Sequence, residues 1–286
     1  MTIIEAKPLE EAFDAEVEFE EIDDDSGLTR SDVTPVVVFL LPGINSSKSW
    51  ASVFHSFSNS PTARQIITET VSGPSDLDTV DLVFRFRLNA FRRDYVSQIT
   101  AALDKHKMEH PSLDVALVCH SMGSAIFADI VQDVVEYSDS NPSIEFHHVV
   151  FLGSVCKRTH NLNLGKLCKR LVNDVGERDI WPIAAWFVNP LKYDPVGRFG
   201  FHRTMVTDRI FPENDHSSCV SDEHLRTWVL PVVEDGIIRN PDFKRGSSPY
   251  NFVRFLHAAF WGALIFFGAQ QLFVSGAPPP HLRHSS

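Results

Sequence analysis

The middle of the chain alternates short apolar runs with longer stretches of helical periodicity, and this alternation restricts the fold more than any other feature. Apolar runs typical of strands buried on both faces occur at residues 36–41, 80–86, 114–119, 148–152, 170–173 and 204–211. Amphipathic helical patterns occur at residues 94–106, 123–137 and 221–229. Residues 35–240 are therefore predicted to form an α/β domain, with a mainly parallel sheet and helices on both faces. Any active site is expected at the carboxyl ends of the strands.

The segment Cys119-His120-Ser121-Met122-Gly123 lies between a predicted strand and a predicted helix. It resembles the nucleophile elbow G-x-S-x-G of the α/β-hydrolase superfamily, with Cys119 in place of the first glycine. That elbow is a tight strand-to-helix turn that projects a serine oxygen, and the following helix N-terminus favours developing negative charge. The resemblance implies that Ser121 is a nucleophile; the alternative is a capping serine in an ordinary turn.

An earlier predicted strand ends in Leu41-Pro42-Gly43-Ile44-Asn45. This segment resembles the H-G-x-x turn of the same superfamily, with Pro42 in place of histidine. In that family the turn supplies one backbone N–H of the oxyanion hole, and the residue after the nucleophile supplies the other. The resemblance therefore assigns the two donors to the backbones of Ile44 and Met122. A plain Pro-Gly turn that closes a strand is the simpler alternative.

The triad acid and base follow the serine in this superfamily, in the order Ser, Asp or Glu, His. The stretch Gly176-x-x-Asp179-x-x-Pro182 looks like the loop that carries the acid. Asp179 is the first candidate and Asp174 the alternative; either could instead cap a helix.

His216 is the candidate base, because it falls in a loop between the last predicted strand and the last predicted helix. His224, inside that helix, is the alternative. His202 precedes the strand, at the wrong end for the site. The remaining histidines after the acid lie in the apolar segment or the tail: His257, His281 and His284.

Several short motifs also look like a group of lipase- or esterase-like hydrolases, several of which carry membrane segments. They are Phe151-Leu-Gly-Ser-Val, Asn173 with Gly176 and Asp179, Trp181-Pro182, His216-Ser217 and Trp228-Val-Leu-Pro231. The resemblance implies a serine hydrolase that cleaves a small-molecule or lipid ester without a metal or organic cofactor. The alternatives are an acyltransferase or thioesterase with the same triad, and a catalytically inactive fold that binds a partner.

The segment 181–201 is rich in aromatic residues and follows the candidate acid. Two interpretations remain open: these side chains wall an acyl pocket or flap, or they pack a helix onto the sheet.

Most of the negative charge lies at the start of the chain. The formal net charge is −11, and residues 1–34 hold twelve acidic residues against Lys7 and Arg30. These residues are interpreted as a solvated acidic arm, although residues 13–19 alternate like an edge strand. The nearly neutral remainder lacks the basic face that a nucleic-acid partner would need. Oligomeric state is not indicated.

The carboxyl-terminal residues change character twice. A polar linker at residues 241–254 is followed by residues 255–274, which contain no Asp, Glu, Lys or Arg, and by a tail at 275–286. About 20 residues in a helix match a hydrocarbon core of about 30 Å, so the segment is predicted to associate with a membrane, as a span. The alternative is a helix buried against the domain or a dimer partner.

The catalytic domain is expected on the cytoplasmic side. Lys244, Arg245 and Arg254 precede the apolar segment, whereas Arg283 alone follows it. No secretory signal pattern is visible at the start, and the four cysteines have no metal-binding spacing. They fit free thiols in a reducing compartment.

Overall fold

A six-stranded sheet forms the centre of the computed structural model, which describes residues 34–43, 49–57, 64–72, 88–140, 146–162, 164, 168, 170–241, 255–263 and 266. Its strand order is β2-β1-β3-β4-β5-β6, and every pairing is parallel. The strands are β1 (Val36–Leu41), β2 (Ile66–Thr70), β3 (Asp114–His120), β4 (Phe146–Leu152), β5 (Leu171–Gly176) and β6 (Val206–Phe211).

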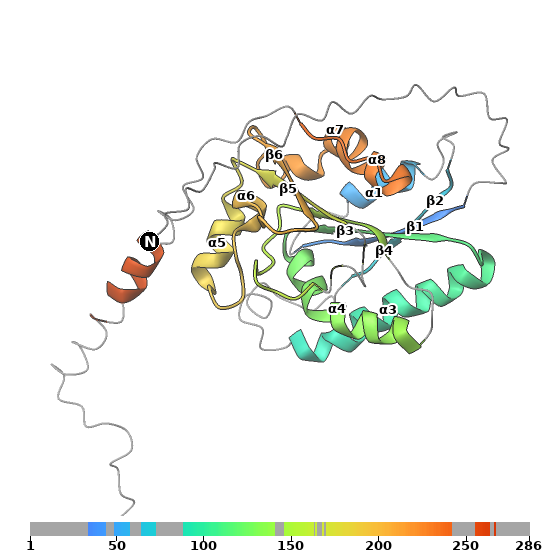
Figure 1. Ribbon diagram of the computed structural model, residues 1–286, viewed down its shortest axis with the longest axis horizontal. Coiled ribbons are helices and arrows are strands. Elements are labelled where there is room, and N and C mark those ends of the chain that lie inside the picture. The colour runs from blue at the N-terminus through green and yellow to red at the C-terminus, as the bar shows by residue number, and fades with distance from the viewer. Residues whose placement is uncertain are drawn as a thin grey trace, which may run out of the picture.

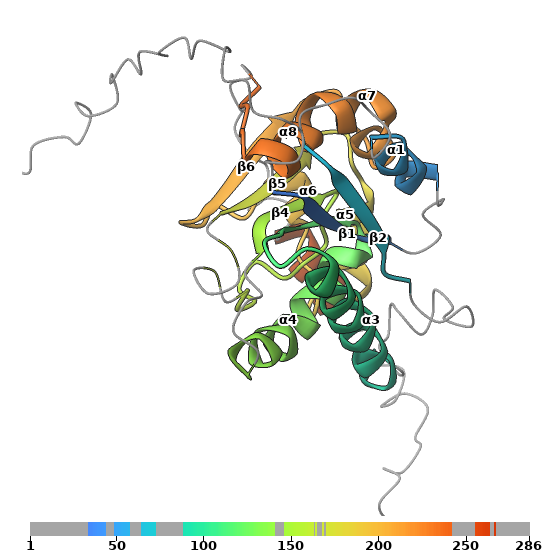
Figure 2. The ribbon, with the colours of Figure 1, turned by 90° about the vertical axis from the view of Figure 1, so that its right-hand side faces the viewer.

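Helices cover both faces of this sheet (Figures 1 and 2). One face carries α3 (Leu88–Glu109) and α4 (Met122–Ser140), and the other carries α1 (Ser49–Phe57), α7 (Asp222–His224) and α8 (Leu230–Asp235). A 3-10 helix η2 (Ser218–Val220) precedes α7, and a π-helix η3 (Leu225–Val229) joins α7 to α8. Two short helices, α5 (Trp181–Val188) and α6 (Val196–Phe199), lie beyond the ends of the strands.

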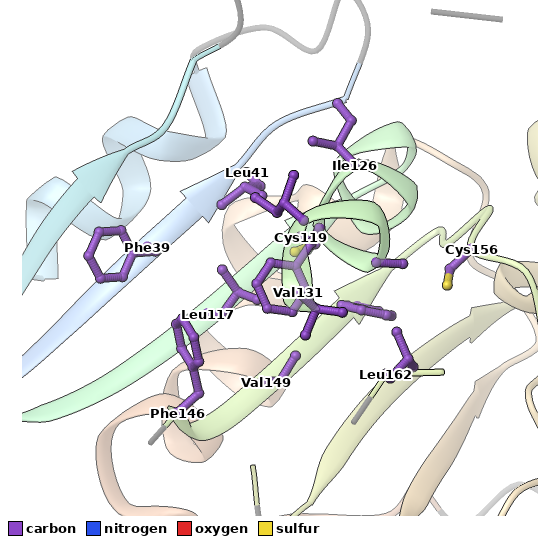
Figure 3. Close-up of a cluster of buried hydrophobic side chains, with 14 of the residues drawn as sticks. Phe39, Leu41, Leu117, Cys119, Ile126, Val131, Phe146, Val149, Cys156 and Leu162 are labelled. Carbon is purple, nitrogen blue, oxygen red and sulfur yellow. The ribbon is translucent and has the colours of Figure 1, made fainter. Parts of the chain in front are cut away.

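Strand β1 shows why the sequences of the central strands are unbroken apolar runs. All six of its residues are buried. Val37, Phe39 and Leu41 pack into the core beneath α3 and α4, whereas Val36, Val38 and Leu40 pack beneath α1 and α8. Figure 3 shows part of the first of these cores, where Phe39 and Leu41 lie in one cluster with residues of β3, α4 and β4. A strand with helices on both faces buries alternate residues on opposite sides, so it needs apolar residues at every position.

The predicted fold class is confirmed for the described residues: the sheet is parallel, with helices on both faces, and this architecture is consistent with an α/β-hydrolase fold. The elements β2 and α1 were not predicted. β2 has the sequence IITET and is the edge strand, with a single buried residue, so its apolar signal is weak. The strand predicted at residues 80–86 lies outside the described residues.

The chain termini are described only in part. The predicted acidic arm ends at residue 34, the first residue that the structure describes. Near the other end, residues 255–263 are helical, as is residue 266, while the rest of the segment 255–274 lies outside the described residues. Within the described ranges, none of the helices has both the length and the apolar character needed to cross a membrane.

Candidate active site

Ser121 occupies a sharp turn between β3 and α4. Its φ of 53° lies in the left-handed region, which costs energy for any residue other than glycine and is therefore kept only where the surrounding structure imposes it. The Ser121 amide donates a hydrogen bond of 2.8 Å to the Leu152 carbonyl at the end of β4, which fixes the turn against the sheet. The turn has the strained strand-to-helix geometry that the sequence motif implies.

Cys119 departs from the motif without opening the turn. It is fully buried and pairs in register with Leu41 on one side and Phe151 on the other. Its side chain packs into the core beneath α4 (Figure 3), so the sulfur takes up core volume instead of space at the turn. Burial raises the pKa of the Cys119 thiol well above its usual value, so the thiol stays protonated.

Two buried serines support the start of α4. The Ser124 hydroxyl donates a hydrogen bond of 2.7 Å to the Ser121 carbonyl. It also accepts hydrogen bonds from the Ser154 hydroxyl, at 2.9 Å, and from the Val155 amide, at 3.2 Å. These bonds tie the turn after β3 to the segment after β4, so the backbone that presents Ser121 is held from two sides.

The turn after β1 approaches Ser121 closely. A Cβ added at Gly43 would lie 2.7 Å from the Ser121 Cβ and 3.2 Å from the Met122 amide nitrogen, so only glycine fits there. Met122 is the first residue of α4, and the first amides of a helix have no acceptor within it. The structure therefore places Gly43 and the Met122 amide beside Ser121. Ile44, the other predicted oxyanion donor, lies outside the described residues.

His216 and Asp179 form a hydrogen-bonded pair. The distance from His216 Nδ1 to Asp179 Oδ2 is 2.7 Å; the carboxylate is almost fully buried, and the histidine side chain is 18% exposed. Because an ionised carboxylate only accepts, Nδ1 carries a proton, and in the neutral imidazole Nε2 therefore has a free lone pair. A Cβ at Gly153, whose φ is +53°, would lie 2.9 Å from His216 Nδ1 and 3.0 Å from Asp179 Oδ2. The glycine after β4 thus leaves room for the pair.

The loop that carries His216 is joined to the turn that carries Ser121. His120 Nε2 lies 3.2 Å from the His216 carbonyl oxygen, and the two imidazole rings have centroids 4.7 Å apart. The Cys219 thiol donates to the same carbonyl at 3.1 Å. Since a carbonyl only accepts, His120 carries its proton on Nε2. Burial, and then the nearby His216, lower the pKa of His120 to about 3, so it stays neutral.

His120 was not among the predicted site residues, although it lies inside the motif. Because His120 precedes Ser121, the sequence predicts it only as the last residue of a buried strand. The loop that carries His216 contacts it only in the folded protein. Strand β3 and this loop are far apart in the sequence, so no local pattern indicates the contact.

Asp174, the alternative acid, belongs to a separate buried cluster. Arg209 binds both of its oxygens, at 2.7 and 2.9 Å, and His224 Nε2 lies 2.9 Å from Oδ2. His224 Nδ1 in turn lies 3.1 Å from Asn214 Nδ2. The structure thus brings His216 together with Asp179, and His224 together with Asp174. His202 lies on the loop before β6, with its amide bonded to Asp208, and His257 stacks on Trp186.

The charges of this cluster control its ionisation. Burial alone would raise the pKa of Asp174, but the charge of Arg209 and the hydrogen bond from His224 outweigh it and hold the pKa below its usual value. A lowered pKa in the folded state stabilises the fold above the unfolded value of about 4, and this stabilisation is lost as the pH falls through the folded-state pKa. The cluster is therefore expected to contribute to acid unfolding.

Asp174→Asn is expected to lower the free energy of unfolding by about 3–5 kcal/mol, because it leaves the fully buried Arg209 without its counter-charge. Urea unfolding followed by circular dichroism measures the change. Arg178→Met, which removes an exposed pair with Glu213, is the matched control and should cost no more than about 0.5 kcal/mol. Equal losses in both variants would contradict the role of the buried cluster.

His120→Phe is expected to lower kcat/KM about tenfold, the effect of losing a hydrogen bond worth about 1.4 kcal/mol, because it keeps a ring beside His216 but removes the Nε2–H donor. The change is measured as the rate of hydrolysis of a soluble nitrophenyl ester. His55→Phe, on the exposed side of α1, is the control. Unchanged rates in His120→Phe would show that the carbonyl of His216 needs no bond from His120.

The aromatic residues after Asp179 serve different purposes: some pack in the protein and one lies beside the site. Trp186, Tyr193, Phe199 and Phe201 are buried; Tyr193 and Phe201 belong to the core beneath α3 and α4, and Trp186 stacks on His257. Trp181 is 61% exposed, and its ring centroid lies 6.4 Å from that of His216. The Trp181 amide also donates a hydrogen bond of 3.0 Å to Asp179 Oδ1, which orients the carboxylate. Core packing thus accounts for most of the segment, and one tryptophan borders the site.

Comparison with known proteins identifies similar structures but no family. No protein-family model matches the chain, and no curated protein matches it significantly. Among solved structures, XC6422 from Xanthomonas campestris, described as a serine hydrolase without a lid, is 10% identical. The match covers 73% of this chain and 85% of that one, with a TM-score of 0.45.

Two further structures are similar to a comparable degree. A hydrolase from Agrobacterium vitis is 15% identical over 71% of this chain and 91% of its own, with a TM-score of 0.45. Dienelactone hydrolase from Anabaena variabilis is 16% identical over 68% and 86%, with a TM-score of 0.39. At such identities and scores, the assignment of chemistry depends on the geometry of the site itself.

Proposed function

We propose that the protein is a serine hydrolase that cleaves an ester or a similar acyl bond through an acyl-enzyme on Ser121. The observation that carries this proposal is the pair of His216 and Asp179, 2.7 Å apart, in a loop bonded to His120, the residue before a serine in a strained turn. The turn presents a nucleophile, the pair supplies an oriented base, and the adjacent helix N-terminus favours negative charge. These are the parts that acyl transfer to water requires.

In the proposed mechanism, His216 Nε2 takes the proton from the Ser121 hydroxyl while the oxygen attacks the acyl carbon. Asp179 holds the imidazole in the Nδ1–H tautomer and stabilises the imidazolium that forms. The Met122 amide donates to the oxyanion, together with Ile44 by the family resemblance. The imidazolium then protonates the leaving alcohol, and water attacks the acyl-enzyme with His216 again as base. The low pKa of His120 keeps a second positive charge away from the imidazolium.

A fluorophosphonate probe tests the proposal, because it reacts covalently with an activated serine. We expect stoichiometric labelling of the protein at Ser121, located by peptide mass mapping, and hydrolysis of at least one member of a panel of nitrophenyl esters, lipid esters and thioesters. Cleavage of thioesters alone would favour a thioesterase, and transfer to an added alcohol would favour an acyltransferase. A folded protein that neither labels nor turns over any ester would be the inactive binding fold.

We further propose that the segment 255–274, whose first turns pack on α5, associates the protein with a membrane, with the catalytic domain on the cytoplasmic side. The support is the absence of charged residues from this segment and the basic residues Lys244, Arg245 and Arg254 before it. An anchor of this kind would suit a lipid-soluble ester.

The full-length protein is expected to resist carbonate extraction from membranes, whereas a chain that ends at Ser248 is expected in the soluble fraction. The physical reason is that about 20 uncharged, mainly apolar residues are lost with the segment. Both proteins are fractionated in parallel and detected by immunoblotting. Full-length protein in the soluble fraction without detergent would contradict the anchor.

A further inference from the structure

Large apolar side chains that are exposed to solvent gather on one part of the described surface. Those of α5 and its flanks are Ile180, Trp181, Val188 and Leu191, and those of the carboxyl-terminal helix are Phe255, Leu256, Phe260, Trp261 and Phe266. These nine residues are called the apolar face below. Among the described residues, the other exposed large apolar side chains are Met108, Met205 and Ile237, which lie on separate elements. Patches of this kind on a protein surface mark sites of interaction.

The two helices that carry most of the apolar face are in contact with each other. His257, which is 7% exposed, stacks on Trp186 of α5 with ring centroids 4.0 Å apart, and Phe187 and Phe260 are 6.2 Å apart. The Trp261 indole donates a hydrogen bond of 2.8 Å to His257 Nε2. In Figure 1 the carboxyl-terminal helix, drawn in red, lies beside α5 at one end of the molecule. The helix is held along one side and exposes Phe255 and Phe260.

The chemistry of the apolar face fits a lipid surface. Its side chains include tryptophan and phenylalanine, which favour the boundary between headgroups and acyl chains. The sequence that follows the helix, residues 264–274, is without charge and continues the apolar character of the face.

Basic residues border this face. A cavity of about 420 Å³ is lined by residues that include Lys157, Arg158, Trp186 and His257, with Asp194 as its acidic residue. The ammonium of Lys157 donates a hydrogen bond of 2.5 Å to the carbonyl of Leu191, which places a positive charge at the edge of the apolar face. Basic side chains next to exposed aromatic residues can bind the anionic headgroups of lipids while the aromatic residues enter the acyl region.

We propose that the apolar face of the catalytic domain docks onto a bilayer that contains anionic lipids, with Leu191 and Phe260 in the acyl region and Lys157 at the level of the headgroups. Trp181 belongs to the face and lies 6.4 Å from the ring of His216, so docking turns the site toward the lipid. An anchor in the tail alone would tether the domain without orienting it. The apolar face supplies the orientation.

The cysteines of the protein make a direct test possible. All four are buried, so a cysteine introduced on the surface is the thiol that an environment-sensitive fluorophore labels first. The full-length variants Leu191→Cys, Met108→Cys and Phe266→Cys are labelled with a nitrobenzoxadiazole dye and mixed with vesicles of phosphatidylcholine and phosphatidylglycerol. Residue 108 is the matched control for residue 191, because the two residues are 80% and 81% exposed.

The label at residue 191 is expected to shift its emission to the blue and to lose intensity when the vesicles carry a quencher on their acyl chains. The label at residue 108, on α3, is expected to change in neither respect. Lys157→Gln in the Leu191→Cys background should reduce the shift. If the label at 266 enters the lipid while that at 191 stays in water, only the tail inserts and the proposal is overturned. Equal responses at 191 and 108 would overturn it as well. No hydrolysis is read, so the result is independent of the proposed activity.

Discussion

Ser121→Ala is expected to abolish labelling by a fluorophosphonate and to lower ester turnover by about 10⁶-fold, the scale measured when the nucleophile of a serine hydrolase is removed. The reason is that, within the described part of the chain, the hydroxyl groups nearest to the turn do not replace it: Ser124 and Ser154 are fully buried and bonded to each other. Gel-based labelling and a continuous ester assay measure the two effects.

The control for this experiment is the fold of the variant. Alanine adopts the backbone conformation of Ser121 with about the same strain as serine, so urea unfolding of Ser121→Ala should match that of the wild type. Ser56→Ala, on the exposed side of α1, should label and turn over normally. A folded Ser121→Ala variant that labels at the wild-type rate would remove Ser121 as the nucleophile.

Asp179→Asn is expected to lower turnover by about 10⁴-fold, the effect of a wrong histidine tautomer in a serine triad. The amide can donate where the carboxylate accepts, which favours the tautomer of His216 with its proton on Nε2 and removes the lone pair that the serine needs. Initial rates per mole of folded protein measure the loss.

Asp174→Asn provides the comparison, because Asp174 lies within β5 and Asp179 follows the same strand. It disturbs the cluster of Arg209 and His224, so its main effect is on stability, and turnover per folded molecule should fall far less. The reverse ranking of the two variants would assign the acid to Asp174 and would require His216 to leave its present partner.

The distinction between Asp174 and Asp179 also marks how far the sequence could predict this site. The motif around Ser121 is local, so the residues themselves predict a strand, a turn and a helix. Both aspartates occur in one short segment, and the decisive partner of Asp174 is Arg209 in the neighbouring strand. A charged residue within β6 contradicts the apolar pattern of a buried strand and was the available signal for a buried ion pair. The contact between His120 and the 216 loop depends on how strands far apart in the sequence are arranged, which periodicity does not encode.

The fold itself was predictable where strands are buried on both faces and not where they are exposed. β1 and β3 need apolar residues at every position, and this requirement is visible in the sequence. β2 pairs with one neighbour and contains Thr68, Glu69 and Thr70, so its β-branched residues favour a strand but its apolar pattern is weak.

The order of the strands has a consequence for the synthesis of the protein. Ser121, Asp179 and His216 follow β3, β5 and β6, and β5 pairs with β6 at the far edge of the sheet. A nascent chain that has completed β4 has the Leu152 carbonyl that holds the turn of Ser121, but it has no base until β6 has emerged and paired. The growing chain is therefore catalytically inactive while its sheet is incomplete. A fragment that ends before residue 216 should be inert toward esters, even if its first strands have folded.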